Sequence, residues 1–112
     1  MAIPRPIPDD LAELIATRLR VIGDASRIRI LDQLRDGELS VTALSDRLGT
    51  SQQNVSKHLG ILLQAGIVGR RKEGTSALYS VTDESVFELC EQICGGLQSR
   101  LAELNEMVGG RS

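Results

Sequence analysis

Aromatic side chains are nearly absent from this sequence, which has no tryptophan and only Tyr79 and Phe87. A surface that binds another protein usually exposes aromatic residues. Long apolar runs are missing too, and none approaches the roughly 20 residues that a membrane-spanning helix needs. These absences argue against an aromatic protein-binding surface and against a membrane protein.

Cysteine and histidine are also scarce, with two and one residues respectively. Two cysteines are too few for a disulfide framework, and a cytosolic chain would hold them reduced. The N-terminal segment MAIPRPIPDD is rich in proline and lacks the apolar core of a secretory signal. We therefore expect a cytoplasmic protein, and 112 residues suit one compact domain.

Acidic residues are missing from one segment, although the whole chain carries a formal net charge of −2. Between Ser51 and Lys72 there is no Asp or Glu. The basic side chains of that segment are Lys57, Arg70, Arg71 and Lys72, with His58 besides. Because local charge decides binding more than the total does, this segment is a candidate site for a polyanion.

The first part of the chain predicts an arm followed by two helices. Three prolines disfavour helix in residues 1–8, and a helix then begins near Asp9 or Asp10, either of which could cap it. Apolar residues recur at helical spacing from there to a break at Gly23. Asp24 is expected to cap the second helix.

Two further helices are expected in quick succession. Ser40 caps the third, and Gly49 suits the left-handed position just after its end. Thr50 with Gln53 matches a capping box that starts the fourth helix at once. Gly66 ends it.

The remaining sequence predicts a hairpin and a last helix. Strands at 67–72 and 75–81 are joined by a turn at Glu73-Gly74. Thr82 caps the last helix, which runs to about Met107. The expected fold is mostly α with a small β-hairpin, in the order α-α-α-α-β-β-α. The expected organisation is an arm at 1–8, a single domain at 9–107 and a frayed terminus at 108–112.

The third and fourth helices have the spacing of a helix-turn-helix, in which the second helix enters the DNA major groove. Its first turn carries uncharged side chains that both donate and accept hydrogen bonds, as base edges require. Gln or Asn can bond adenine twice, while Lys57 and His58 suit phosphate or guanine. The candidate DNA contacts on this helix are Ser51, Gln52, Gln53, Asn54, Ser56, Lys57 and His58.

The hairpin that follows is basic at Arg70, Arg71 and Lys72. Beside a helix that reads DNA, such a hairpin is a "wing" whose cations contact the backbone or the minor groove. Alone, charged strands often only discourage aggregation at a sheet edge, and short helices with a glycine turn occur in many α-helical domains. The conjunction of these features in this order favours DNA binding.

Residues 23–81 resemble the ArsR/SmtB family of bacterial winged-helix repressors. The motifs that carry the resemblance are SRIRIL, VSKHL and LLQAGIVGRRKEG. The resemblance implies a homodimer formed by the first and last helices on a pseudo-palindromic operator, with repression relieved by a small inducer, often a metal ion or metalloid. It places Ser51, Gln52, Gln53, Ser56 and His58 on DNA, with Lys57 near phosphate.

The sequence departs from the family pattern at two places. Asp24-Ala25 stands where the family often has Asp-Pro, and Gln53 stands where proline is frequent. If Gln53 closes a capping box, it is less free to read a base. Gln52 and Ser56 are therefore the stronger expected readers.

Neither metal site of the family is expected here. At the positions of the family's Cys-x-Cys pair the chain has Ser40 and Thr42, and hydroxyls bind soft metals poorly. A second family site uses Asp and His on the last helix, whereas the only histidine here is His58. No cofactor is predicted at either site.

Cys90 and Cys94 lie four residues apart on the last helix, so both thiols point to one side. As a sensor, the pair would bind a soft metal or metalloid, or oxidise. As core, Cys90 would simply pack in an apolar stripe. Glu88 and Glu91 are close in sequence and disfavour a thiolate. Both interpretations stay open.

Other classes of function fit less well. No Cys-His pair has a spacing that suggests an enzyme, and no glycine-rich phosphate loop is present. A winged-helix protein–protein module without DNA is the alternative, since a fold does not fix a function. We expect a DNA-binding transcriptional repressor, and a steep salt dependence of duplex binding would separate these classes.

Overall fold

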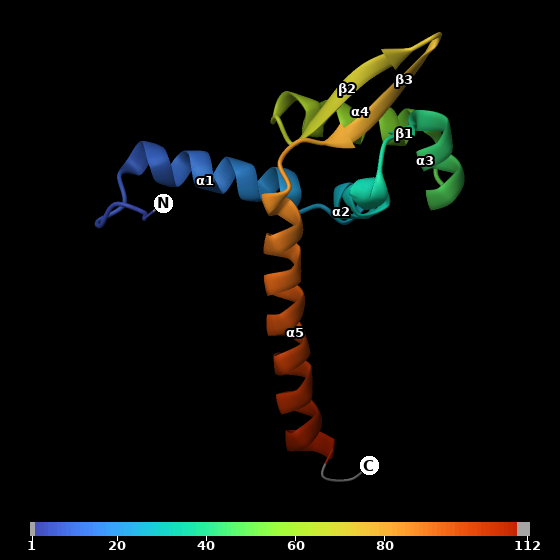
Figure 1. Cartoon of the computed structure of the whole chain (residues 1–112). Coiled ribbons are helices and arrows are strands. Elements are labelled where there is room, and N and C mark those ends of the chain that lie inside the picture. Colours follow the sequence, from blue (N-terminus) through green and yellow to red (C-terminus); the bar gives the residue numbers. More distant parts are fainter. Residues whose placement is uncertain (1, 110–112) are drawn as a thin grey trace.

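A computed structural model describes residues 2–109, in which three helices and a small sheet form one body from which two longer helices extend (Figure 1). The elements are α1 (Asp9–Ile22), α2 (Ala25–Gln33), the 3-10 helix η1 (Leu34–Asp36), β1 (Leu39–Ser40), α3 (Val41–Leu48), α4 (Gln52–Gln64), β2 (Val68–Glu73), β3 (Ser76–Val81) and α5 (Ser85–Gly109). The expected winged helix-turn-helix fold is confirmed. Within the described range, no helix is both long and apolar enough to cross a membrane.

Local side-chain chemistry sets the helix ends around the helix-turn-helix. Asp24 caps α2 by accepting hydrogen bonds from the backbone N–H groups of Ser26 and Arg27, at 2.9 Å and 3.2 Å. Ser40 caps α3 in the same way. Gly49 then adopts the left-handed conformation, with φ 65°, which glycine reaches without a steric penalty. These three predictions are confirmed.

The predicted start of α4 is wrong by one residue. Ser51, not Thr50, is the cap, and its hydroxyl accepts a hydrogen bond from the backbone N–H of Asn54 at 3.0 Å. The Thr50 hydroxyl instead accepts one from the side-chain amide of Asn54, at 3.1 Å. The proposed capping box with Gln53 does not form, because the cap lies one residue nearer to α4.

The predicted caps of α1 and α5 are also wrong. Pro8 precedes α1 and no side chain caps it, so Asp9 and Asp10 are its first helical residues. At α5, Asp83 accepts a hydrogen bond from the Ser85 backbone N–H, whereas the Thr82 hydroxyl donates to the Gly66 carbonyl. Helix α5 continues to Gly109, beyond the expected end near residue 107. Of the terminus expected to fray, residues 110–112 lie outside the described range.

The hairpin belongs to a three-stranded antiparallel sheet in the order β1-β3-β2. Its turn lies at Gly74-Thr75, one residue later than predicted, and Gly74 has φ 63°. Strand β1 was not predicted, because two residues are too few to show an alternating pattern. It pairs Leu39 with Tyr79 and Ser40 with Leu78, so the sheet is joined directly to the start of α3.

The core lies between α2, α3 and α4 and the adjoining ends of β2 and α5. Its most deeply buried side chains are Ile30, Leu44, Val55, Leu59, Leu62, Ile67 and Val86. Burying such side chains contributes about 1.5–3 kcal/mol each. The packing fixes the inner face of α4 and leaves its outer face free.

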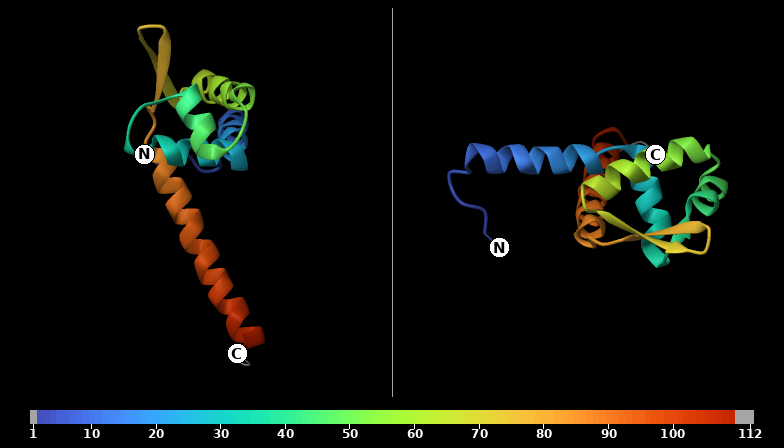
Figure 2. Two further views of the ribbon diagram at one scale, coloured as in Figure 1. Left: turned by 90° about the vertical axis from the view of Figure 1, so that its right-hand side faces the viewer. Right: turned by 90° about the horizontal axis from the view of Figure 1, so that it is seen from above.

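Helices α1 and α5 extend away from this body in different directions (Figures 1 and 2). Both carry exposed apolar side chains: Leu14 on α1 is 69% exposed, and Leu97 and Leu101 on α5 are 59% and 58% exposed. Contiguous apolar surface of this kind marks an interaction site.

Candidate nucleic-acid interface

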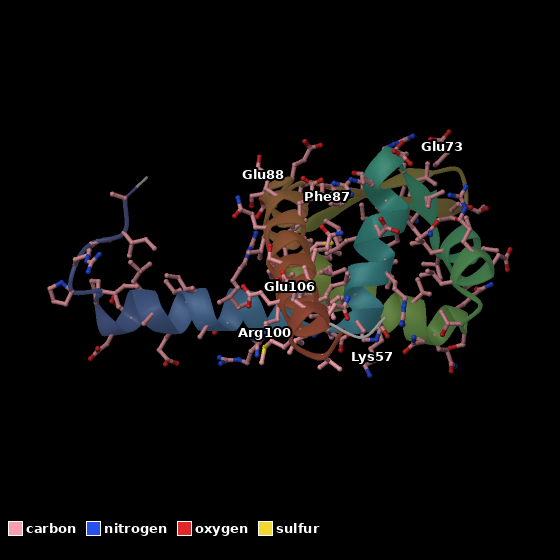
Figure 3. The ribbon with its side chains drawn as sticks, turned by 90° about the horizontal axis from the view of Figure 1, so that it is seen from below. Lys57, Glu73, Phe87, Glu88, Arg100 and Glu106 are labelled. Atoms are coloured by element: carbon pink, nitrogen blue, oxygen red, sulfur yellow. The ribbon has the colours of Figure 1, made fainter. Side chains whose placement is uncertain are left out.

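The outer face of α4 presents polar side chains to solvent. Gln52, Gln53, Ser56 and Lys57 are exposed, and Lys57 projects outward from the helix (Figure 3). Within the described residues, Lys57 has no acidic partner. Gln53 takes no part in a cap, so it is as free as Gln52 to meet a base edge.

Two of the expected contacts at the tip of α4 are already engaged within the chain. The Ser51 hydroxyl caps the helix, and the Asn54 amide donates to Thr50. Asn54 is also half-buried. Gln52, Gln53 and Ser56 are therefore the exposed polar side chains of this tip that remain candidates for contact with base edges.

The expectation that His58 faces DNA is corrected by its position in the core. The side chain is only 6% exposed, and its Nδ1 atom lies 3.1 Å from Nη1 of Arg27 on α2. Its place could have been inferred, because Val55, His58, Leu59 and Leu62 follow the spacing of one helix face.

The wing, β2 and β3, divides its cations between two faces of the sheet. Arg70 lies opposite Tyr79 and Lys72 opposite Ala77, and successive residues of a strand point to opposite faces. Arg71 therefore points to the other side from its two neighbours. Within the described residues, Arg70 and Lys72 form no ion pair.

Arg71 is held by two carboxylates. Its Nε and Nη2 atoms donate to the two oxygens of Glu38, at 2.7 Å and 2.8 Å, and Nη1 donates to Glu73. The hydrogen bonds to Glu38, followed by those to Glu73, raise the pKa of Arg71. The same contact lowers the pKa of Glu38. Arg71 is thus the wing cation least available to a phosphate.

Arg29 is a further candidate that the sequence patterns did not single out. It is exposed on α2, and no acidic side chain pairs with it in the described part of the chain. With Ser26, Thr50 and Asn54 it lines a hollow of about 110 Å³ beside the start of α4. A cation there suits the sugar–phosphate backbone next to the bases that α4 would meet.

The two cysteines lie away from this surface, on α5. Cys90 is half-buried and lines a hollow of about 210 Å³ between α2 and α5, together with Arg29 and Arg35. The Arg35 guanidinium lies 4.9 Å from the centre of the Phe87 ring and pairs with Glu91. The surroundings of Cys90 are therefore not purely acidic, as the sequence suggested.

Cys94 is exposed on α5. Among residues 2–109, no three His, Cys, Asp or Glu side chains gather where they could hold a metal ion. A sensor role for the thiols of Cys90 and Cys94 stays a prediction.

Comparison with known proteins identifies the family of the helix-turn-helix. The helix-turn-helix domain family matches residues 22–71. The HTH-type transcriptional regulator NmtR of Mycobacterium tuberculosis is 36% identical over 87 residues, which cover 78% of this chain and 72% of that protein.

Two solved structures share the fold, at sequence identities of 30% and 26%. The crystal structure of Rv0081 from Mycobacterium tuberculosis has a TM-score of 0.76 and 30% identity, and the match covers 86% of this chain and 97% of that one. The second is the solution structure of the homodimeric winged helix-turn-helix DNA-binding domain of Mb0332 from Mycobacterium bovis, a possible ArsR-family regulator. Its TM-score is 0.72 at 26% identity, covering 89% and 95% of the two chains.

Proposed function

Because this chain belongs to the ArsR/SmtB family of winged-helix, DNA-binding transcriptional regulators, we propose that it represses transcription by binding a double-stranded operator as a homodimer. Helix α4 enters the major groove, and the wing contacts the flanking backbone. Repression follows from geometry, since a dimer that covers its operator blocks access to that DNA.

The observation that carries this proposal is the exposed, uncharged first turn of α4 beside cations without acidic partners. The exposed side chains of Gln52, Gln53 and Ser56 offer hydrogen-bond donors and acceptors that can pair with the edges of bases. Lys57 follows one turn later, and Arg70 and Lys72 lie on the wing. The uncharged polar side chains would give sequence specificity, and the cations would give affinity for the phosphate backbone.

The homodimer is supported by the apolar side chains that α1 and α5 leave exposed. On α5 they are Ile93, Leu97, Leu101, Leu104, Met107 and Val108. A two-fold axis through such a contact presents two copies of α4 to DNA, which requires an operator with two inverted half-sites.

Fluorescence anisotropy on the DNA upstream of the chain's own coding sequence tests the proposal, with a random duplex of equal length as competitor. We expect specific binding that weakens steeply as salt rises, because cations on the protein release counterions from the phosphates. Equal affinity for both duplexes, or a flat salt dependence, would contradict it.

We also propose that a thiol-reactive signal releases the operator through Cys90 and Cys94. The hollow of about 210 Å³ that Cys90 lines supports this, because a small thiol reagent could enter it and reach the half-buried side chain. Arsenite, as a soft thiol ligand, and a mild oxidant should each reduce operator binding. The Cys90→Ser/Cys94→Ser variant should keep its affinity under both treatments; if parent and variant respond alike, these cysteines are not the switch.

A further inference from the structure

Arg27 on α2 joins the end of α1 to the middle of α4. Its side chain is only 13% exposed. Its Nε atom donates a hydrogen bond to the carbonyl oxygen of Val21 at 2.5 Å, and Nη2 donates to that of Arg20 at 3.4 Å. Its Nη1 atom lies 3.1 Å from Nδ1 of His58. One guanidinium thus bridges two helices from a third.

The chemistry of the pair fixes the state of the imidazole. A guanidinium has five N–H donors and no acceptor. Nδ1 of His58 must therefore accept, which requires a neutral ring with its proton on Nε2. A second proton, on Nδ1, would remove the acceptor and set two cations 3.1 Å apart.

We propose that Arg27 and His58 are a positioning pair which holds α4 in register against the end of α1, and that protonation of His58 releases the pair and lowers discrimination between operator and other DNA. This inference rests on the proposed function. It assigns to His58 a role behind the reading surface, instead of a contact with DNA.

Protonation of His58 should change the discrimination between operator and random DNA more than the total affinity for DNA. Hydrogen bonds to base edges weaken steeply when distance or angle changes, so a small rotation of α4 would disturb Gln52 and Ser56 first. Contacts of Lys57 with phosphate tolerate such movement, and a new positive charge on His58 does not repel DNA. Total affinity can therefore persist while specificity falls.

The other charges near His58 do not change over the relevant pH range. Asp24 faces both His58 and Arg27, with its Oδ2 atom 4.0 Å from Nη2 of Arg27. The backbone N–H of Arg27, above other causes, lowers the pKa of Asp24, so this carboxylate stays ionised while an imidazole gains a proton. Lys57 points outward (Figure 3). Within residues 2–109, no charged side chain of α3 or β2 bonds to His58.

A first experiment tests the pair without DNA. Because His58 is the only histidine, its imidazole resonance can be assigned without ambiguity in a proton NMR spectrum. We expect the amide resonances of residues 20–22 and of α4 to shift with the same midpoint as the imidazole when the pH is lowered. If the amides at the end of α1 do not follow the imidazole, the proposed coupling is wrong.

A second experiment measures the ratio of operator to random-duplex affinity over the same pH range. We expect the ratio of the parent protein to fall about tenfold, the equivalent of one weakened base contact. His58→Asn places a carbonyl oxygen near the position of Nδ1 and does not titrate, so its ratio should stay flat. Equal pH dependence in the two proteins would overturn the proposal.

Two further variants separate positioning from a direct contact. Lys57→Gln should weaken binding to both duplexes and keep the pH dependence of the ratio. Arg27→Lys keeps the charge but loses the guanidinium fork, and should already lower the ratio at pH 8. If the parent binds neither duplex at any pH, the proposed function fails, while the spectra of the free protein still decide whether the pair couples α1 to α4.

Discussion

Glu38 binds Arg71 with both of its carboxylate oxygens. The acid lies outside the hairpin, just before β1, and reaches the wing because β1 pairs with β3. A wing cation that suits DNA phosphate is thus engaged by acids of the same chain. Both side chains are partly exposed, at 52% and 35%, so water weakens the pair and a phosphate can compete for the guanidinium.

Replacing Glu38 by Gln should therefore tighten binding to operator and random DNA alike. The freed Arg71 would add about one phosphate contact, so the slope of log affinity against log salt should steepen by about one. Anisotropy titrations at several salt concentrations measure both effects. Glu88→Gln removes the same charge from the exposed start of α5 and should change little. Weaker binding by the Glu38 variant would show instead that this acid braces the wing.

Gln52→Ala should cost about 1–3 kcal/mol on the operator and relax its specificity, because a base-reading side chain is lost. Competition titrations with operator variants give the size of the loss and the base pair concerned. Gln64→Ala, at the other end of α4, is the matched control and should bind as the parent does. An equal loss on random DNA would mean that Gln52 does not read a base.

Arg29→Gln should weaken binding to all duplexes by a similar factor and flatten the salt slope by about one, because a backbone contact carries no sequence information. The comparison is with Arg35→Gln, which removes a guanidinium that pairs with Glu91 on the side facing α5. We expect no change in salt slope for that control. If the two variants have the same slope as the parent, Arg29 does not contact phosphate.

Asp83→Asn should lower the free energy of unfolding by about 1 kcal/mol near pH 7, because it removes the negative charge that pairs with Arg18 and strengthens the hydrogen bonds from Ser85. The Ser85 hydroxyl first, and then Arg18, lower the pKa of Asp83 in the folded protein. The stabilisation is therefore present above the unfolded pKa of about 3.9 and is lost as pH falls through the lower folded value.

Urea unfolding at a fixed protein concentration measures this difference from pH 7 down to pH 2. Parent and variant should converge at the acid end. Asp46→Asn, at an exposed position on α3, serves as the control. A difference between parent and Asp83→Asn that does not change with pH would contradict the expected cause.

Leu101→Glu should dissociate the proposed homodimer, since it places a charge within the exposed apolar stripe of α5. Sedimentation velocity measures the assembly state, and operator affinity should fall with it. Ala102→Glu adds the same charge to the same helix on a different face and should remain dimeric. Equal behaviour of the two variants would place the interface elsewhere.

The features predictable from sequence were those fixed by neighbouring residues. Asp24, Ser40 and Gly49 act within one helical turn, so residue type and spacing were enough to place them. Ser51 and Thr50 are both residue types that cap well, so residue type alone did not distinguish them, and the structure has Ser51 as the cap. Strand β1 forms only through its pairing with the distant strand β3, and two residues are too few to show a strand pattern in the sequence.

The site was predictable to a similar extent. Exposed polar residues on α4 followed from the apolar spacing of the opposite face. The burial of His58 followed from that same spacing, but its position within the reading helix and the resemblance to a family both led to the expectation of a DNA contact. The engagement of Arg71 by Glu38 joins residues 33 positions apart and needed the folded sheet to be seen.

Ser40 is both the last residue of β1 and the cap of α3. At this junction the sheet that carries the wing and the first helix of the helix-turn-helix therefore share one residue, with no linker to act as a hinge. The distance between the proposed groove contact of α4 and the proposed backbone contact of the wing is therefore fixed by the fold. A signal that frees the operator would have to change the separation or tilt of whole protomers, because bending the wing alone would distort the start of α3.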